Sequence, residues 1–197
     1  TWTALPALKV DAARLREHHV VTLTSGGEAA PFDALRTRTL QQMRTNNWHS
    51  LAITSPGPGC GKSTVALNLA FSLARQADLR VILLELDLRR PSLARTLGLH
   101  SEASLADVLK GRAPFEAAAR RHGDNLAIAV NLAPVRSPAE LLSAPQVPGI
   151  LADIRKRYAP DLVIFDLPPM MVNDDTIAFL PQVDCALLVA AAEITGV

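Results

Sequence analysis

The chain has 197 residues, a formal net charge of +1 and a composition that is 49% hydrophobic and 20% charged. This length and composition indicate one globular domain with a sizeable core, and the near-neutral charge argues against a nucleic-acid partner. The two cysteines, Cys60 and Cys185, are too few for a disulfide framework, and their spacing is not that of a metal site. No apolar run approaches the ~18 residues that span a bilayer. Since no signal peptide is visible at the N-terminus, we expect a cytoplasmic location.

The first thirty residues differ in pattern from the rest of the chain. Residues 1–30 hold scattered charges and a candidate short strand at Val20–Leu23, and we predict that they form a leader or linker. From Phe32 to about Asn46 apolar residues recur on one side at helical spacing, which predicts a helix. The main domain is therefore expected to occupy residues 31–197.

The most informative segment is a Gly-rich stretch, Pro56–Thr64, with the sequence P-G-P-G-C-G-K-S-T. It lies between an apolar strand pattern at Leu51–Ser55 and an apolar helical pattern at Val65–Ala74. Its first residue, Pro56, stands in place of the first glycine of the Walker A consensus. In this setting the N–H groups of the turn bind phosphate oxygens, and the helix N-terminus adds partial positive charge. Lys62 can reach the β- and γ-phosphates, and the Ser63 hydroxyl can bind Mg²⁺. The sequence therefore predicts a nucleotide site formed by Gly57, Gly59, Cys60, Gly61, Lys62, Ser63 and Thr64.

The rest of the chain alternates between strand and helix patterns. A buried strand is predicted at Arg80–Asp87, and a capping box of Ser137 with Glu140 opens a helix. The other expected helices begin at Pro91 or Ser92, at Ser104 (to Leu109) and at Val147 (to Tyr158), and the other strands are Leu126–Val130, Leu162–Asp166 and Cys185–Ala190. This alternation predicts an α/β fold, a parallel β-sheet with helices on both faces.

Acidic residues stand at the ends of two predicted strands. Ligands of such sheets bind at the carboxyl ends of the strands, so we expect Glu85, Asp87 and Asp166 to meet the Gly-rich loop at one edge. A carboxylate there can hold Mg²⁺ or accept a proton from an attacking hydroxyl. The period of two in a strand puts Glu85, Asp87 and Arg89 on the same side. A structural ion pair of Asp87 with Arg89 or Arg90, and a turn cap made by Asp166, are the alternatives.

Together these residues resemble the bacterial tyrosine kinases (BY-kinases) of exopolysaccharide and capsule synthesis. In that family an apolar strand ends in Asp-x-Asp-x-Arg, and this chain has Glu85-Leu86-Asp87-Leu88-Arg89. The family's Walker B stretch ends in Asp-x-Pro-Pro, which matches Asp166–Pro169, with Asp175 where a further family Asp falls. Leu105–Gly111 and Ser137–Leu142 resemble two other recurrent family elements. The likeness extends from about Phe32 to Thr195.

The resemblance implies a P-loop NTPase architecture of the MinD/ParA type, MgATP as phosphate donor and tyrosine as acceptor. It implies that Lys62 stabilises the transferring phosphate and that Arg89 joins the nucleotide site. It assigns Mg²⁺ to Ser63, Asp87 and Asp166, and it places Glu85 near the acceptor hydroxyl or the metal. The catalytic set implied in this way is Lys62, Glu85, Asp87 and Asp166.

Three features depart from the family pattern. Glu85 is one methylene longer than the usual Asp, which moves its carboxylate by more than about an ångström where sites need placement within about 0.5 Å. Family members carry Glu-x-x-Arg-x-x-Arg on the first helix for ring assembly, and of Ala30, Asp33 and Arg36 only the last matches. The family also has a tyrosine-rich tail, whereas the single tyrosine here, Tyr158, is expected to pack in a helix.

The leading hypothesis is therefore an ATP-dependent protein tyrosine kinase or autokinase domain that regulates exopolysaccharide or capsular polysaccharide synthesis or export. The alternatives are a nucleotide-binding regulator with weak catalysis, and a partition-type P-loop ATPase. The expected partners are a membrane polysaccharide co-polymerase or chain-length protein, a tyrosine on its own tail or on another protein, and a second copy of the chain. We expect the domain to work at the inner face of the cell membrane, and to continue beyond Val197.

Overall fold

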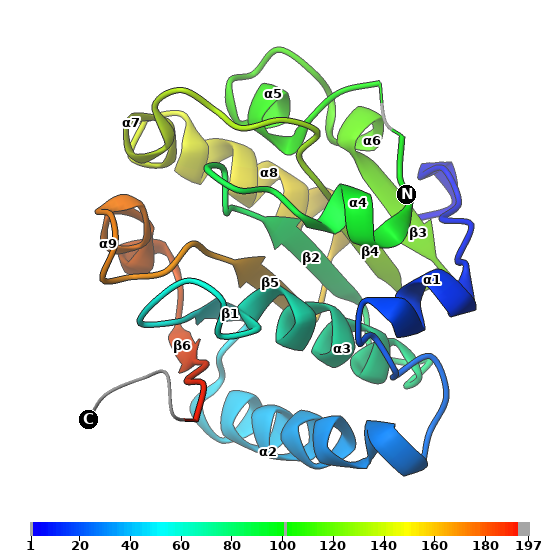
Figure 1. Cartoon of the computed structure of the whole chain (residues 1–197). Coiled ribbons are helices and arrows are strands. Elements are labelled where there is room, and N and C mark those ends of the chain that lie inside the picture. Colours follow the sequence, from blue (N-terminus) through cyan, green and yellow to red (C-terminus); the bar gives the residue numbers. More distant parts are fainter. Residues whose placement is uncertain (1, 101, 193–197) are drawn as a thin grey trace.

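The computed structural model describes residues 2–100 and 102–192, and it contains one sheet flanked by helices (Figure 1). Within these residues the strands lie in the order β3-β4-β2-β5-β1-β6. All neighbouring pairs are parallel except β3 and β4, which are antiparallel. The strands are β1 (Ser50–Thr54), β2 (Val81–Glu85), β3 (Ala119–His122), β4 (Leu126–Ala129), β5 (Leu162–Asp166) and β6 (Cys185–Leu188).

The helices connect the strands and cover both faces of the sheet. The α-helices are α1 (Ala12–Glu17), α2 (Ala30–Asn46), α3 (Lys62–Ala74), α4 (Leu93–Leu97), α5 (Leu105–Leu109), α6 (Phe115–Ala118), α7 (Pro138–Leu142), α8 (Val147–Tyr158) and α9 (Asp175–Phe179). Short 3-10 turns occupy Trp2–Ala4, Gly27–Ala29 and Leu180–Gln182. None of the helices in the described ranges is long and apolar enough to cross a membrane.

Two apolar cores lie on opposite faces of the sheet because successive strand residues point to opposite sides. In β2, Ile82 and Leu84 join the core formed with α5 to α8, whereas Val81 and Leu83 join the core formed with α1 to α4. Each central strand is buried along its whole length, as a continuous apolar run requires in a sheet covered on both faces. The predicted α/β fold with helices on both faces is confirmed.

The N-terminal segment differs from its prediction in secondary structure. Residues 20–23 form no strand, and the regular element nearby is α1, which Asp11 caps by accepting hydrogen bonds from the N–H groups of Ala13 and Arg14. Leu8 and Leu15 are buried in the core beneath α3 and α4, so this segment packs on the sheet domain. The boundary at residue 30 stays a prediction, and the last five residues of the predicted domain, 193–197, with Thr195, lie outside the described residues.

Several short elements were missed or misplaced by sequence reasoning. The elements α6, β3 and α9 were not predicted, and β6 ends at Leu188 rather than at residue 190. No side-chain capping bond forms at Ser137, so the predicted capping box is wrong there. A box forms instead at α5, where the Ser104 N–H donates to the Asp107 carboxylate over 3.1 Å. These elements have only four or five residues, too few for hydrophobic periodicity to identify them.

Candidate active site

The Gly-rich loop lies between β1 and α3, at the carboxyl edge of the sheet, together with the segments that follow β2 and β5 (Figure 1). Gly59 and Gly61 have φ angles of 80° and 85°, a backbone region that favours glycine. A Cβ placed on Gly57, Gly59 or Gly61 would meet no atom within 4 Å, so the space beside these three glycines is open. Gly61 is the N-cap residue of α3, whose N-terminus therefore faces this open space with its partial positive charge.

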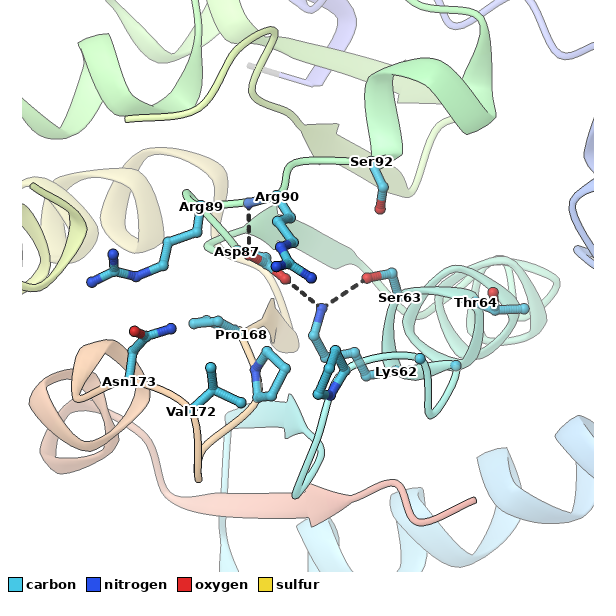
Figure 2. Close-up of a pocket in the computed structure, with 14 residues that line it drawn as sticks. Lys62, Ser63, Thr64, Asp87, Arg89, Arg90, Ser92, Pro168, Val172 and Asn173 are labelled. Atoms are coloured by element: carbon cyan, nitrogen blue, oxygen red, sulfur yellow. Dashed lines mark hydrogen bonds and ion pairs between the residues drawn. The ribbon is translucent and has the colours of Figure 1, made fainter. Parts of the chain in front are cut away.

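A cavity of about 510 Å³ opens between the three segments. Figure 2 shows the residues that surround it, with Lys62 extending towards Asp87 and the Arg90 side chain turned towards Lys62, while Arg89 extends away. The walls are formed by the loop and the start of α3 (Pro58, Gly59, Gly61, Lys62, Ser63, Thr64), the segment after β2 (Asp87, Arg89, Arg90, Ser92) and the segment after β5 (Pro168, Pro169, Val172, Asn173).

Lys62 is the centre of the charge arrangement. Its ammonium lies 2.7 Å from a carboxylate oxygen of Asp87 and 3.8 Å from Asp166, and it donates to the Ser63 hydroxyl over 3.2 Å. Burial lowers the pKa of Lys62, but the nearby carboxylates, Asp166 first, outweigh this effect and the net shift is upward. Lys62 is therefore held as a cation at the start of α3, beside the Gly-rich loop. Its predicted reach to the β- and γ-phosphates stays a prediction.

Asp166 has no hydrogen-bond partner in the described structure for either of its carboxylate oxygens, although it is fully buried. Burial raises the pKa of Asp166 to about 6, and the Lys62 ammonium and the nearby Ser63 hydroxyl, which lies outside hydrogen-bond geometry, oppose that rise. A buried carboxylate without partners is costly unless a cation or donor joins it. The turn-cap alternative for Asp166 is not supported, since no backbone N–H of residues 2–100 or 102–192 donates to its carboxylate.

These residues fit a magnesium ion. Among the described residues no group of three or more His, Cys, Asp or Glu side chains could hold a metal by itself. Magnesium is bound through one or two carboxylates with substrate phosphates and waters. Asp87 and Asp166, with the Ser63 hydroxyl beside Lys62, supply oxygen ligands of that kind.

Glu85 lies elsewhere than expected. Its side chain is fully buried and absent from the cavity wall, and its carboxylate accepts hydrogen bonds from the backbone N–H groups of Ser92, Leu93 and Asn131 over 2.6, 2.8 and 2.7 Å. Burial raises the pKa of Glu85 to about 7, although these backbone hydrogen bonds oppose the rise. The period-of-two argument placed Glu85 and Asp87 on the same side, but β2 ends at Glu85 and the chain then turns.

Arg89 lines the cavity, but its guanidinium is committed to Asp175. The two groups form two hydrogen bonds of 2.6 and 2.9 Å, and Asp175 is fully buried in α9. The predicted alternative of an Asp87–Arg89 ion pair is wrong, because Asp87 pairs with Lys62 and Arg89 with Asp175. Arg90, to which sequence reasoning gave no ligand role, is exposed on the cavity wall. The signal was present in the Arg-Arg-Pro sequence, but the sequence does not say which arginine would be engaged by an acid.

Two other predictions concern residues away from the cavity. Tyr158 is 1% exposed, and its hydroxyl donates to Glu116 over 2.7 Å, so the expectation that it packs inside the domain is confirmed. Arg36, the residue retained from the family's ring-assembly motif, donates to the Ser72 carbonyl oxygen over 3.2 Å and forms an ion pair with Asp33 within the same chain.

Comparisons with known proteins identify the family of this chain. A family model for the ParA group, described as NUBPL iron-transfer P-loop NTPases, matches residues 46–193, about three quarters of the chain. The tyrosine-protein kinase ptk of Acinetobacter johnsonii is 30% identical over 80% of this chain and 22% of its own length. YwqD, a tyrosine-protein kinase of Bacillus subtilis, is 29% identical over 86% of this chain and 71% of its own length. Apart from YwqD, the chain spans about a fifth of the length of the curated relatives that it matches.

Solved structures show the same architecture. The kinase domain of VpsO superposes with a TM-score of 0.70 and 29% identity, over 81% of this chain and 79% of that domain. MinD of Pyrococcus horikoshii, solved in complex with Mg-ADP, shares the fold, with a TM-score of 0.57 and 24% identity over 72% of this chain and 57% of its own. The chain belongs to the ParA-type P-loop NTPases and, within them, to the bacterial tyrosine-kinase family.

Proposed function

We propose that this chain is the MgATP-dependent catalytic domain of a protein tyrosine kinase. The observation that carries the proposal is the cluster of Lys62, Asp87 and the buried Asp166, whose oxygens accept no hydrogen bond within the described residues, beside an open Gly-rich loop. The relatives named as tyrosine kinases and the Mg-ADP complex of the MinD neighbour support the same reaction and ligand.

Each residue of the cluster has a task in binding or transfer. The loop N–H groups and the N-terminus of α3 bind the phosphates, and Lys62 supplies positive charge at the transferring group. Ser63, Asp87 and Asp166 would hold Mg²⁺, which when bound neutralises charge on the phosphates. Arg90 adds a second cation on the facing wall, while Arg89 is restrained by Asp175. Asp87 is the carboxylate on the cavity wall, and we assign to it the proton that leaves the tyrosine hydroxyl. In the same step the bond from the γ-phosphorus to the tyrosine oxygen forms, and its bond to the bridging oxygen breaks, so that ADP leaves.

The acceptor tyrosine has to come from outside the folded part described here. Tyr158 is the single tyrosine of the 197 residues, and its hydroxyl is bonded to Glu116 inside the domain. The substrate is therefore a tyrosine on another protein or on a segment that joins this domain in a longer chain. The family likeness supports a role in exopolysaccharide or capsule synthesis, with a membrane co-polymerase as partner, self-association as a second contact, and a location at the inner face of the membrane.

The test is phosphate transfer from labelled ATP to a tyrosine-rich peptide, with and without Mg²⁺. We expect Mg²⁺-dependent transfer that falls by at least about a hundredfold in Lys62→Ala, with phosphotyrosine as the product. Lys9→Ala is the matched control, since Lys9 lies in the N-terminal segment away from the cavity. If ATP binds tightly and no tyrosine is modified on any peptide or on the full-length protein, the chain is a nucleotide-binding regulator instead.

A further inference from the structure

Glu85 joins three segments that meet behind the cavity. One carboxylate oxygen accepts from the Ser92 and Leu93 N–H groups at the start of α4, and the other accepts from the Asn131 N–H after β4. The Asn131 side-chain amide in turn donates to the Glu85 carbonyl oxygen over 2.7 Å. Its own oxygen accepts from the Ala106 N–H in α5 over 2.9 Å. The end of β2 is thereby tied to α4, to the end of β4 and to α5.

The segment between these ties carries three of the four charged residues that line the cavity, Asp87, Arg89 and Arg90. Residues 86–92 leave β2 at Glu85 and return to its carboxylate at Ser92, so both ends of the segment are fixed by one residue. Within it, one oxygen of Asp87 accepts from the Arg90 N–H over 3.0 Å and the other binds Lys62. The position of Asp87 and Arg90 against Lys62 thus depends on a loop whose two ends Glu85 holds together.

The length of glutamate is needed for this arrangement. Shortening the side chain by one methylene withdraws the carboxylate by about 1.5 Å. Hydrogen bonds of 2.6, 2.7 and 2.8 Å to three separate N–H groups cannot all survive that withdrawal, because a polar contact much beyond 3.5 Å is no longer a hydrogen bond. The buried amides of Leu93 and Asn131 would then lack a partner.

We infer that Glu85 is a positioning residue, one that fixes the segment carrying Asp87 and Arg90. The length of its side chain suits the hydrogen bonds that it accepts, so it is not a poorly placed substitute for a catalytic aspartate. The effect on transfer rests on the proposed function, whereas the effect on the loop does not. Glu85→Asp, which restores the family's usual aspartate, should therefore loosen this segment and slow phosphate transfer.

The experiment compares Glu85→Asp with the wild type by amide hydrogen exchange and by transfer kinetics. We expect exchange at Ser92, Leu93 and Asn131 to rise by about tenfold or more, as lost bonds to a charged acceptor allow local opening. We also expect kcat to fall by about tenfold with a smaller change in the KM for ATP, since the misplaced groups act on the transferring phosphate.

Two further variants separate positioning from general stability. Glu85→Gln keeps the length, so its oxygen can keep the Ser92 and Leu93 N–H groups while its NH₂ faces the Asn131 N–H, and exchange should rise at Asn131 more than at the other two. Glu116→Asp shortens a remote carboxylate that accepts from Tyr158, and it should leave the three amides and kcat unchanged.

Unchanged protection of the three amides in Glu85→Asp would overturn the inference. A kcat equal to or above that of the wild type would overturn it too, because it would show that an aspartate serves the reaction directly. If the wild type transfers no phosphate, the proposed function fails, while the exchange data still decide whether Glu85 holds the loop.

Discussion

Glu85 and Asp166 lie side by side as register partners at the ends of the neighbouring strands β2 and β5. Both are fully buried, and burial raises the pKa of both. Yet Glu85 has three backbone donors, and Asp166 has no hydrogen-bond partner in the described structure and only the Lys62 ammonium, 3.8 Å away, for charge. A carboxylate satisfied by the backbone stabilises the fold. Asp166 lies behind Lys62 of the cavity wall with no hydrogen bond to its oxygens, so it remains able to bind a cation that enters there.

The largest expected effect comes from removing the unpartnered carboxylate. Asp166→Asn should lower phosphate transfer by about a hundredfold or more, because it removes a charged ligand of the magnesium site. The same change should raise the melting temperature of the ligand-free protein, since a buried charge without hydrogen bonds is lost. Calorimetry with and without MgATP measures both the stability and the ligand response. A melting temperature that falls in the ligand-free protein would contradict the distinction between the two acids.

Asp175 extends the comparison to a buried carboxylate that an arginine satisfies. Arg89→Ala leaves Asp175 buried and unpaired, and we expect a loss of about 3 kcal/mol in the free energy of unfolding. Arg90→Ala is the matched control on the same segment, with a change within about 0.5 kcal/mol. For ATP affinity we expect Arg90→Ala to be the more damaging of the two variants, with about a tenfold loss. Urea unfolding and nucleotide titration of the two variants test this, and equal stabilities would refute the assignment of the arginines.

The raised pKa values predict how stability depends on pH. The pKa of Glu85 is about 7 and that of Asp166 about 6, above the ordinary values of 4.5 and 3.8. Between the ordinary and the raised pKa of each acid, the folded protein therefore binds more protons than the unfolded chain. The free energy of unfolding is thus greatest below the ordinary pKa values and falls as pH rises through the raised ones. We expect the ligand-free protein to be more stable near pH 5 than near pH 8 by on the order of 2 kcal/mol.

Urea unfolding at constant ionic strength measures that dependence. MgATP should flatten it, because a bound cation favours the ionised Asp166. Asp166→Asn should remove the part of the dependence centred near the pKa of about 6 and leave the part that belongs to Glu85. Stability that rises with pH across this range in the ligand-free protein would show that neither acid is shifted as described.

The smallest effect is expected at a carboxylate far from the cavity. Glu116 accepts from the Tyr158 hydroxyl and lies 2.5 Å from Arg157, so it is satisfied by side chains. Tyr158→Phe removes one of these partners and should cost about 1 kcal/mol of stability. Phosphate transfer to a peptide should not change, because Tyr158 is not the acceptor. A loss of self-phosphorylation in Tyr158→Phe alone would contradict this.

The predictable part of the site is the part whose residues are consecutive. Pro56–Thr64 contains the loop, the lysine and the hydroxyl within nine positions, so their spacing alone predicts a phosphate site. Arg89 could not be assigned in this way, because its partner Asp175 lies 86 positions further along the chain. The elements β3 and α9 were missed for a similar reason: four- and five-residue segments carry too little periodicity, and tertiary contacts hold them in place.

The sequence by itself determined the α/β fold, the alternation of strands and helices, and the meeting of the loop with the acidic strand ends, because parallel strands all deliver their carboxyl ends to one edge. Only the tertiary structure decided which acid is bonded to the backbone and which stays without hydrogen-bond partners. The physical reason is that a buried carboxylate is satisfied by N–H groups that the fold brings from distant segments, such as Asn131 to Glu85, 46 positions apart. Glu85 and Asp166 look alike in sequence, but the backbone donors around Glu85 make it a residue that holds the loop, whereas Asp166 has no such donors and is the proposed magnesium ligand.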